Sequence, residues 1–348
     1  MKIIHTSDLH LGSKISSRFP RELSDRLKGE LRSSFMSLID YAKREGVSLI
    51  LLSGDVFDSD RPFKKDTDFF YRAVEANPEI DFIYLRGNHD VEGERRDIKN
   101  LLTFSEEWTC YSYGDLTVSG IEINNDNRDA LYSTLSLDER KKNIVMLHGQ
   151  TGSGRDSINL ARLADKNIDY LALGHIHSHL EGRLDRRGAY AYSGCLFGRG
   201  FDECGEHGFI ELTVGDKIES RFVKLGAVRI EELTLDVGGA ETLYEIFSRA
   251  DALSLSADKI YRIILTGEID ATIGSPKEEL GAYFEGRCLY ADVKDMTEKR
   301  IDYKAYENDL SLAGEFVRLV ASMELTEEQR SVILHVGLRA IAGKEVEL

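Results

Sequence analysis

Five short apolar runs in the first half of the chain each stop abruptly at polar residues. They occupy residues 2–6, 49–52, 82–85, 144–147 and 170–173. Short runs of this kind, bounded by glycine or polar residues, are typical of strands that are buried on both faces. Apolar residues at helical spacing lie between the first two runs, and a second helix is predicted over residues 66–76. The alternation of strand and helix predicts an α/β fold.

Residues that can bind metals follow all five runs. The segments are Ser7-Asp8-Leu9-His10, Gly54-Asp55, Gly87-Asn88-His89-Asp90, His148-Gly149 and Gly174-His175-Ile176-His177. In open α/β sheets, ligands gather at the carboxyl ends of the strands. We therefore expect these five distant segments to converge on one site.

The pattern changes after residue 182, where further strands at 189–192, 208–214 and 220–223 predict a second sheet. The expected fold is a sandwich of sheets flanked by helices. From residue 228 a smaller α/β unit follows, with strands at 228–235, 259–265 and 288–293. Two helices come after residue 308, and the second begins at Thr326 with the capping-box spacing to Gln329. We predict domains at 1–225, 226–304 and 305–348, the last a helical tail.

The last predicted helix carries apolar residues on more than one face. One set is Ile333, Val336 and Ala340, and the other is Leu334, Leu338 and Ile341. One set can pack on the preceding helix through Phe316, Val317 and Leu319. The other needs a second surface, which is either the core of the chain itself or a partner. The pattern leaves these two alternatives equal.

The composition is that of an ordered protein, with 42% hydrophobic and 30% charged residues among 348. No apolar run approaches the roughly 20 residues that span a bilayer. The first residues lead directly into a strand, which leaves no room for a signal peptide, and the four cysteines lack metal or disulfide spacing. We expect a cytoplasmic protein that does not bind membranes.

The net charge of −16 argues against tight, independent binding to duplex DNA. It does not exclude a local basic rim, because bound cations supply positive charge at a metal site. Arg18, Arg21, Arg26, Lys28 and Arg32 are interleaved with acids on a predicted helix. A solvated helix face is the favoured interpretation, and a rim for a phosphate backbone is the alternative.

The residue types favour a binuclear hydrolytic site. Such a site needs a bridging carboxylate, which Asp55 can supply, and imidazoles and oxygens around it. Asp8 and His10 lie two apart, so in an extended segment both point to one side. His175 and His177 repeat that spacing. The oxygen and imidazole donors, without thiolates, favour two Mn ions, while Mg, Fe and Zn stay open.

These segments together resemble the calcineurin-like metallophosphoesterase superfamily. The resemblance implies that Asp8, His10, Asp55 and His177 hold one metal, and that Asp55, Asn88, His148 and His175 hold the other. It implies that His89 stands beside the metals without binding them and protonates or stabilises the leaving oxygen. The expected nucleophile is a water molecule that the two cations activate.

A closer resemblance is to the SbcD-type and Mre-type nucleases of DNA double-strand-break repair. It rests on residues 5–12, 54–58 and 172–177, and on Tyr192-Ser193-Gly194 with Phe201-Asp202-Glu203. By this resemblance the smaller α/β unit is a capping domain, and the tail docks on an SMC-like ATPase with a coiled coil, of the SbcC type. Some relatives have a histidine three residues after the bridging aspartate, whereas this chain has Asp58.

The sequence therefore predicts a metal-dependent exonuclease or endonuclease subunit that acts on DNA ends with an ATPase, and that could form a homodimer. Two alternatives stay open: a phosphodiesterase or phosphatase for small nucleotides or phosphomonoesters, and a scaffold subunit that retains metal. Arg199, in a glycine-flanked turn, could contact a substrate phosphate, and a purely structural turn arginine is equally consistent with the pattern.

Overall fold

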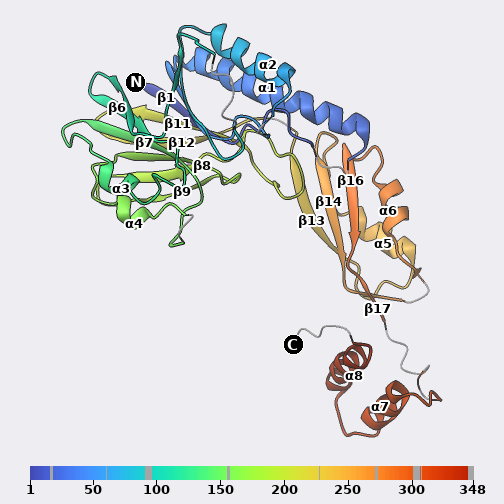
Figure 1. Ribbon diagram of the computed structural model, residues 1–348. Coiled ribbons are helices and arrows are strands. Elements are labelled where there is room, and N and C mark those ends of the chain that lie inside the picture. Colours follow the sequence, from blue (N-terminus) through green and yellow to red (C-terminus); the bar gives the residue numbers. More distant parts are fainter. Residues whose placement is uncertain are drawn as a thin grey trace. The chain divides into compact units, whose positions relative to one another are not determined.

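The computed structural model describes residues 1–15, 19–59, 61–90, 96–154, 157–226, 228–270, 273–300, 306 and 308–343. The chain divides into two compact units. The first comprises Met1–Glu231 with Asp258–Ile260, and the second comprises Glu232–Ala257 with Tyr261–Leu348. The elements of both units are labelled in Figure 1.

Two six-stranded sheets form the first unit. The first sheet has the order β12 (Ile218–Lys224), β11 (Gly208–Val214), β1 (Lys2–Thr6), β2 (Leu49–Ser53), β3 (Asp81–Leu85) and β4 (Leu101–Thr103). The second has the order β5 (Thr109–Tyr113), β6 (Leu116–Gly120), β7 (Lys142–His148), β8 (Tyr170–Gly174), β10 (Ala189–Tyr192) and β9 (Leu180–Arg183). Strands β1 to β4 run parallel, as do β6, β7, β8 and β10.

The sheets pack face to face through alternate residues of their central strands. Leu49 and Leu51 of β2 share one buried cluster with Ile144 and Met146 of β7. On its other face, the second sheet is covered by the short helices α3 (Leu131–Thr134) and α4 (Leu160–Leu163). Burial on both faces explains why these strands lack an alternating polar pattern.

Helices α1 (Arg21–Glu45) and α2 (Lys64–Glu75) lie against the first sheet (Figure 1). The buried face of α1 includes Leu27, Leu31, Phe35 and Leu38, whose spacing of three or four residues gives one apolar stripe. Gly46 ends α1 in the left-handed conformation that favours glycine. The two helices make one wall of the unit, and the loops that enter them carry polar residues.

The second unit contains a three-stranded sheet of order β13 (Ile230–Asp236), β14 (Ile260–Thr266) and β16 (Tyr290–Asp295). Helices α5 (Leu243–Ala250) and α6 (Lys277–Tyr283) contribute to its core, together with Ile269 of strand β15 (Glu268–Ile269), and strand β17 (Glu298–Lys299) pairs with β15. The parallel pair β15 and β17 forms a small separate sheet.

The last two helices are α7 (Leu312–Ala321) and α8 (Glu327–Ile341), which pack on each other. The predicted capping box is present, because the Thr326 side chain accepts from the Gln329 backbone and the Gln329 side chain accepts from Thr326. Val317 and Val320 pack on Leu334 and Leu338. The prediction that Leu319 belongs to this contact is wrong, because its side chain is 62% exposed.

The predicted fold class is confirmed: mixed sheets form a sandwich flanked by helices, followed by a smaller α/β part and a helical pair. The three-domain division stays a prediction, because the two compact units separate near residue 231 and the second includes both later parts. Among the described residues, no helix has the length and hydropathy that crossing a bilayer requires. Arg18 lies outside the described residues.

Candidate metal centre

The seven predicted metal ligands and His89 all lie at or just after strand ends in the first unit. Asp8 and His10 follow β1, Asp55 follows β2, Asn88 and His89 follow β3, His148 ends β7, and His175 and His177 follow β8. Strands β1, β2 and β3 are parallel in one sheet, and β7 and β8 are parallel in the other. Their carboxyl ends therefore meet along one edge of the sandwich.

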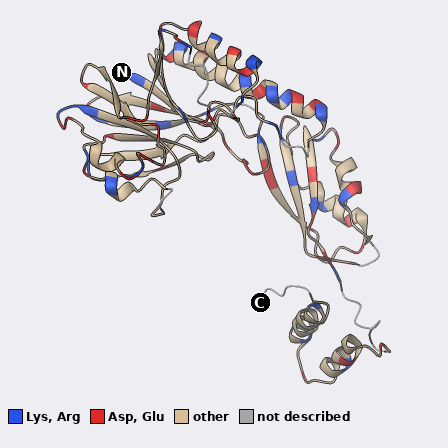
Figure 2. Cartoon of the chain, viewed as in Figure 1, with Lys and Arg blue, Asp and Glu red and all other residues tan. Residues whose placement is uncertain are grey.

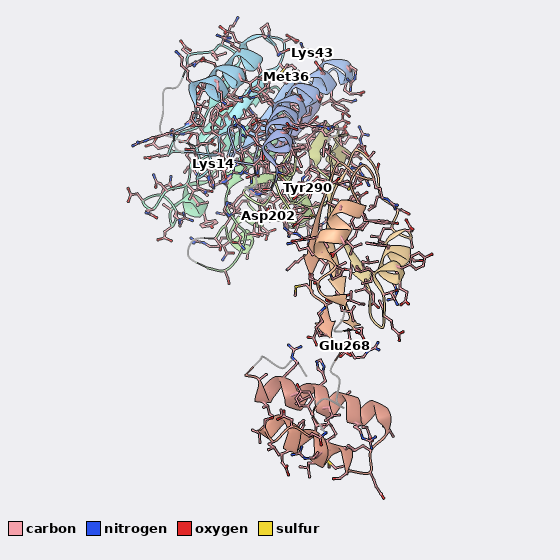
Figure 3. The ribbon with its side chains drawn as sticks, turned by 90° about the vertical axis from the view of Figure 1, so that its right-hand side faces the viewer. Lys14, Met36, Lys43, Asp202, Glu268 and Tyr290 are labelled. Atoms are coloured by element: carbon pink, nitrogen blue, oxygen red, sulfur yellow. The ribbon has the colours of Figure 1, made fainter. Side chains whose placement is uncertain are left out.

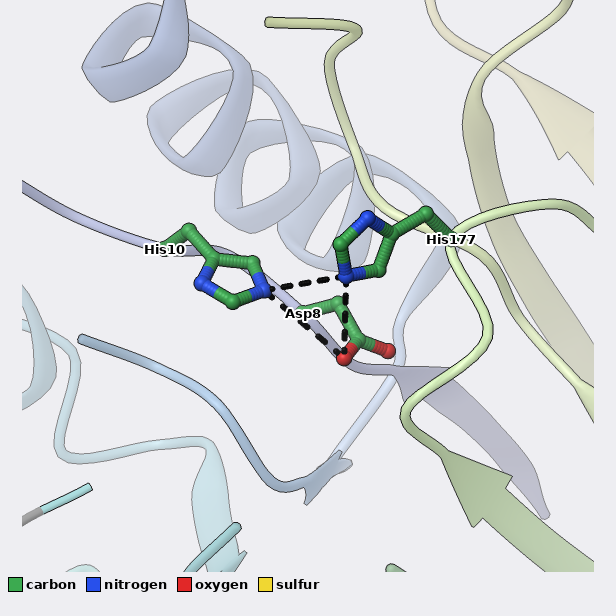
Figure 4. Close-up of side chains that lie close together, drawn as sticks. All are labelled: Asp8, His10 and His177. Atoms are coloured by element: carbon green, nitrogen blue, oxygen red, sulfur yellow. Dashed lines mark hydrogen bonds and ion pairs between the residues drawn. The ribbon is translucent and has the colours of Figure 1, made fainter. Parts of the chain in front are cut away.

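Asp8, His10 and His177 form the first of two clusters (Figure 4). The Nε2 atoms of His10 and His177 lie 3.2 Å apart. Asp8 Oδ1 lies 4.0 Å from the first of these nitrogens and 3.9 Å from the second. Three potential ligand atoms from two strands thus point at one small volume.

Asp55, His148 and His175 form the second cluster, and Asn88 joins it. His148 Nε2 lies 3.3 Å from Asp55 Oδ2 and 3.0 Å from Asn88 Oδ1. His175 Nδ1 lies 3.2 Å from the same amide oxygen. This cluster has one carboxylate, one amide oxygen and two imidazoles.

Asp55 connects the two clusters. Its Oδ2 atom lies 3.3 Å from His148 Nε2 in the second cluster and 3.9 Å from His10 Nε2 in the first. Its other oxygen accepts a hydrogen bond of 2.9 Å from the His89 backbone N–H, which fixes the carboxylate plane. Asp55 therefore occupies the position that a bridging ligand needs.

The backbone at the site is not extended. Asp8, His10, Asp55 and His175 all have positive φ, at 54°, 46°, 53° and 106°. A side chain in these regions costs of order 1–3 kcal/mol. The interpretation that Asp8 and His10 share a side because the segment is extended is therefore wrong, as is the same argument for His175 and His177, which belong to different clusters.

Hydrogen bonds between neighbouring strand ends hold this backbone in place. The N–H groups of Asp8 and His10 donate to the carbonyl oxygens of Gly54 and Asp55, both at 2.9 Å. The His175 N–H donates to the Asp8 carboxylate at 3.0 Å. Asp8, His10 and His175 are thus each held by a hydrogen bond to a residue that follows another strand.

At two positions only glycine fits, because a neighbouring ligand residue lies too close to leave room for a side chain. A Cβ at Gly54 would collide with the His148 ring, and Gly54 itself has φ of +98°. A Cβ at Gly87 would collide with the Asp55 carboxylate and backbone. The glycines before Asp55 and Asn88 are thus a packing requirement of the site.

Three imidazoles are oriented through their second nitrogen, as metal-binding histidines usually are. His177 Nδ1 donates to Glu203 Oε1 at 2.6 Å, and His148 Nδ1 donates to the Ser53 carbonyl oxygen at 2.8 Å. His10 Nδ1 lies 3.0 Å from Asp58 Oδ1. In each case the free Nε2 is left to point at its cluster.

Arg199 connects two of these orienting carboxylates. Its guanidinium pairs with Glu203, and its Nη1 donates to Asp58 Oδ1 at 2.8 Å. The side chain is mostly buried. These contacts favour a role in positioning Asp58 and Glu203, and the predicted contact with a substrate phosphate stays a prediction.

The charges of the site shift the pKa values of its groups. Burial opposes the charged form of His148, but its hydrogen bond to Asp55 and the charges of Asp55 and Asp8 outweigh burial and raise its pKa to about 9. Burial likewise acts to raise the pKa of Asp55, but the His148 contact prevails and lowers it to about 2. Burial lowers the pKa of His10. Ionised Asp55 is thus the state that a cation would meet.

His89 is exposed and lies outside both clusters, next to the buried ring of His10. The ring centroids of His10 and His89 are 5.2 Å apart. Potential ligand atoms of His89, His10 and Asp58 also lie within 4.8 Å of one another, so these three residues form a further group that could hold a metal ion. Asp90 anchors the loop, since its carboxylate accepts from the backbone N–H groups of Gly87 at 2.9 Å and Phe57 at 2.8 Å. His89 is therefore placed beside the clusters on a fixed loop, and its catalytic role stays a prediction.

The donor set fits a pair of divalent cations. Two imidazole nitrogens that face each other at 3.2 Å, next to a carboxylate, form an arrangement that a cation between them stabilises. The second cluster offers the same kinds of donor, and Asp55 reaches both. Oxygen and nitrogen donors without sulfur suit Mn, Mg, Fe or Zn, so the metal's identity does not follow from the geometry.

Fold and site together define a phosphoesterase of the metal-dependent kind. The chain belongs to the calcineurin-like phosphoesterase family, whose model matches residues 1–179. That segment contains all seven predicted metal ligands, and the enzymes of this family use a centre of two metals.

Two relatives and one solved structure are similar to this chain. The uncharacterized metallophosphoesterase YhaO of Bacillus subtilis is 29% identical over 82% of this chain and 76% of the relative. The DNA double-strand break repair protein Mre11 of Sulfurisphaera tokodaii is 31% identical over 53% of this chain and 51% of its own length. A dimetal phosphatase from Danio rerio has a TM-score of 0.43 and 10% identity over 61% of this chain and 92% of that one.

The structure brings the seven predicted ligands together, and their ligation stays a prediction. Sequence reasoning did not assign Asp58 and Glu203 as partners of ligand imidazoles. A signal for Glu203 was present, since it lies in the Phe201-Asp202-Glu203 segment that carried the family resemblance. Asp58 was noted only as a departure from the pattern of some relatives.

The first prediction concerns Asp55→Asn. Loss of the bridging charge leaves two cations that repel each other at roughly 3.5–4 Å, so we expect both metals to bind more weakly and hydrolysis to be abolished. Metal content per chain and turnover of bis-p-nitrophenyl phosphate measure the effect. Full double occupancy with near-normal turnover would show that Asp55 is not the bridge.

The second prediction concerns His89→Ala. We expect this variant to keep both metals and to lose roughly 10²–10⁴-fold in turnover, which is the usual contribution of a general acid. Metal content and turnover are measured on the same preparation. Loss of one metal ion from the variant would instead identify His89 as a ligand.

The third prediction concerns Glu203→Gln, which removes the charge that holds His177 Nδ1. Changes to such supporting partners usually cost about 10–100-fold in metal affinity, and we expect the weaker of the two metal-binding steps to shift in this range. Calorimetric titration of the metal-free protein measures it. Glu206→Gln, which changes an exposed carboxylate three residues away that pairs with Lys224, is the control and should titrate like the wild type. Equal affinity in both variants contradicts the positioning role.

Proposed function

We propose that this chain is a nuclease that hydrolyses phosphodiester bonds of DNA and works in repair with an SMC-like ATPase. The observation that carries the proposal is the similarity to Mre11, which is 31% identical to this chain across 203 residues. The chain spans about half the length of that relative. YhaO, which matches over most of this chain, supports a common architecture that includes the second unit.

The residues around the clusters suit the hydrolysis of a phosphate diester. Two divalent cations at this centre would activate water and neutralise charge on the phosphoryl oxygens. His89, which is exposed and next to His10, is in place to give a proton to the leaving oxygen. Glu203 and Asp58 hold the rings of His177 and His10, so that the donors do not have to reorganise.

A cavity of about 510 Å³ opens beside the second cluster and is lined by Asn88, His148 and His175. Arg86 lies in its wall, where its Nε donates to Glu122 Oε1 at 2.9 Å. Arg128 lines the same wall, as do the carboxylates Glu106 and Glu122. A phosphate group can thus approach Asn88 and the two histidines from this side.

The terminal helices support the proposed partner. Among the described residues, seven of the thirteen exposed large hydrophobic side chains lie between residues 310 and 341. Leu312 and Leu319 of α7 are 72% and 62% exposed, and Val332 of α8 is 58% exposed. The buried contact between α7 and α8 uses other residues, so this second face is available to a partner.

A digestion assay tests the proposal. End-labelled DNA, bis-p-nitrophenyl phosphate and the monoester p-nitrophenyl phosphate are each offered with Mn, with and without a candidate coiled-coil ATPase, and Asp55→Asn is the inactive control. We expect DNA and the diester to be cleaved, and the ATPase to stimulate the digestion of DNA. Cleavage of the monoester alone would overturn the nuclease assignment and support a phosphatase.

The fourth prediction concerns the exposed face of the tail. The double variant Leu312→Glu with Leu319→Glu places two charges on a surface that the proposal buries against the ATPase. We expect it to lose ATPase binding by at least tenfold while diester hydrolysis and the melting temperature stay unchanged, because both side chains are exposed in the chain alone.

The matched control is Leu180→Glu, which charges an exposed leucine of β9 in the first unit and should bind the ATPase normally. Removal of residues 308–348 should have the same effect as the double variant. A double variant that melts several degrees lower would place this face against the core of the chain itself and contradict the docking proposal.

A further inference from the structure

A second cavity of the first unit, of about 700 Å³, lies between the loop after β1 and the first turns of α1 and α2. We call it the basic groove. Five cations line it, namely Lys14, Arg21, Lys28, Arg32 and Lys65, against the carboxylates Asp25 and Asp66. The groove thus carries three excess positive charges in a chain whose net charge is −16. Figure 2 shows the alternating charges along α1, and Figure 3 labels Lys14 on the entering loop.

The ion pairs within the groove leave this excess in place. Asp25 is shared, since Lys28 Nζ lies 3.1 Å and Arg21 Nε lies 4.0 Å from its carboxylate. Asp66 is buried and pairs with Arg32. Arg21 and Lys28 remain well exposed on their shared carboxylate, with side chains 96% and 47% accessible. An exposed cluster of this kind attracts a polyanion.

An aromatic side chain lies among these cations. Phe63 lines the groove, its side chain is 65% exposed, and Lys65 Nζ lies 5.5 Å from its ring centroid. A large apolar ring that is open to solvent within a basic groove is the combination that proteins use to bind single-stranded nucleic acid, where cations follow the backbone and rings stack on bases. A cavity of this volume suits a few nucleotides of one strand rather than a duplex.

The basic groove is close to the candidate metal centre. Ser13 lines the groove, and its Oγ accepts from Arg199 Nη1 at 3.4 Å. The same Arg199 atom donates to Asp58, whose Oδ1 lies 3.0 Å from His10 Nδ1. The side chains of Arg199 and Asp58 therefore connect the groove to the first cluster.

We propose that the basic groove binds a single strand of nucleic acid that leads to the metal centre, with its phosphates on Lys14, Arg21 and Lys65 and a base stacked on Phe63. The proposal rests on the proposed nuclease function and adds the form of the substrate, a strand with an unpaired end. It also selects between the two interpretations of the basic residues of α1, because Arg21, Lys28 and Arg32 line the groove whereas Arg26 does not.

The test measures the binding of a fluorescent oligothymidylate of about 20 nucleotides to the full chain, in EDTA so that no strand is cut. The triple variant Lys14→Ala, Arg21→Ala, Lys65→Ala should reduce the slope of log affinity against log salt by about 2, since each phosphate contact on a single strand contributes about 0.7. The control triple variant removes three exposed cations elsewhere in the first unit, Arg183, Arg186 and Lys217, and should keep the wild-type slope.

Stacking is tested separately by Phe63→Leu and Phe63→Tyr, the second of which keeps the ring. We expect Phe63→Leu to bind oligothymidylate about 5- to 150-fold more weakly, and Phe63→Tyr to bind like the wild type. An abasic strand of the same length should not distinguish the three proteins. Equal binding of oligothymidylate by all three, or equal losses with the abasic strand, overturns the stacking part of the proposal.

A second readout separates this inference from the nuclease function itself. None of the altered residues lies in the metal clusters, so hydrolysis of bis-p-nitrophenyl phosphate should be unchanged in every variant. If the wild type digests DNA with Mn while the triple variant keeps the wild-type salt slope, the groove is not the path of the strand. If the wild type binds oligothymidylate through the groove but cleaves no DNA with Mn, the proposed function fails and the binding site stands.

Discussion

The burial of two carboxylates is the constraint on which the rest of the site depends. Asp8 and Asp55 are each 1% exposed, and an ionised carboxylate in such a place is costly unless opposite charge and hydrogen bonds compensate for it. The chain supplies part of this compensation through the backbone N–H groups of His175 and His89 and through the His148 ring. Two cations would supply the rest. The left-handed backbone at Asp8 and Asp55 follows from the same need, because only sharp turns at the strand ends bring these carboxylates under the donors of neighbouring strands.

The sequence was sufficient to predict which residues form the site, but not the geometry in which they meet. Five apolar runs that each end at metal-competent residues indicated that the runs meet at one edge, and the parallel order of β1, β2 and β3 brings this about. The two-residue spacing of Asp8 and His10 predicted an extended backbone, whereas both residues have positive φ. Alternation along a strand requires an extended backbone, and positive φ at both residues depends on hydrogen bonds to Gly54 and Asp55 that sequence spacing does not reveal. The partnership of His177 with Glu203 is equally hidden, because it depends on how a loop after β10 folds back on β8.

For the fold as well, the hydrophobic pattern predicted some features, whereas tertiary packing decided others. Burial on both faces gave the central strands a continuous apolar pattern, and the sandwich followed from it. In the terminal helices the pattern was ambiguous, since both faces of α8 are apolar. Val317 and Val320 lie three residues apart and face α8, whereas Leu319 lies out of phase with them and is exposed. Helical spacing favours Val320 over its neighbour Leu319 as a partner of Val317.

The acidic character of the chain is compatible with an anionic substrate because electrostatic forces in salt solution are local. At physiological ionic strength the screening length is about 8 Å, so carboxylates on distant surfaces contribute little at a given contact. A phosphate group interacts mainly with charges within that distance. These are the proposed cations at the metal centre and, in the basic groove, five cationic side chains and two carboxylates. The negative charge of the rest of the surface also affects the proposed path of the strand. It disfavours binding of nucleic acid elsewhere on the surface, where no cation neutralises the phosphates, so that a strand is retained only where the groove and the centre hold it together.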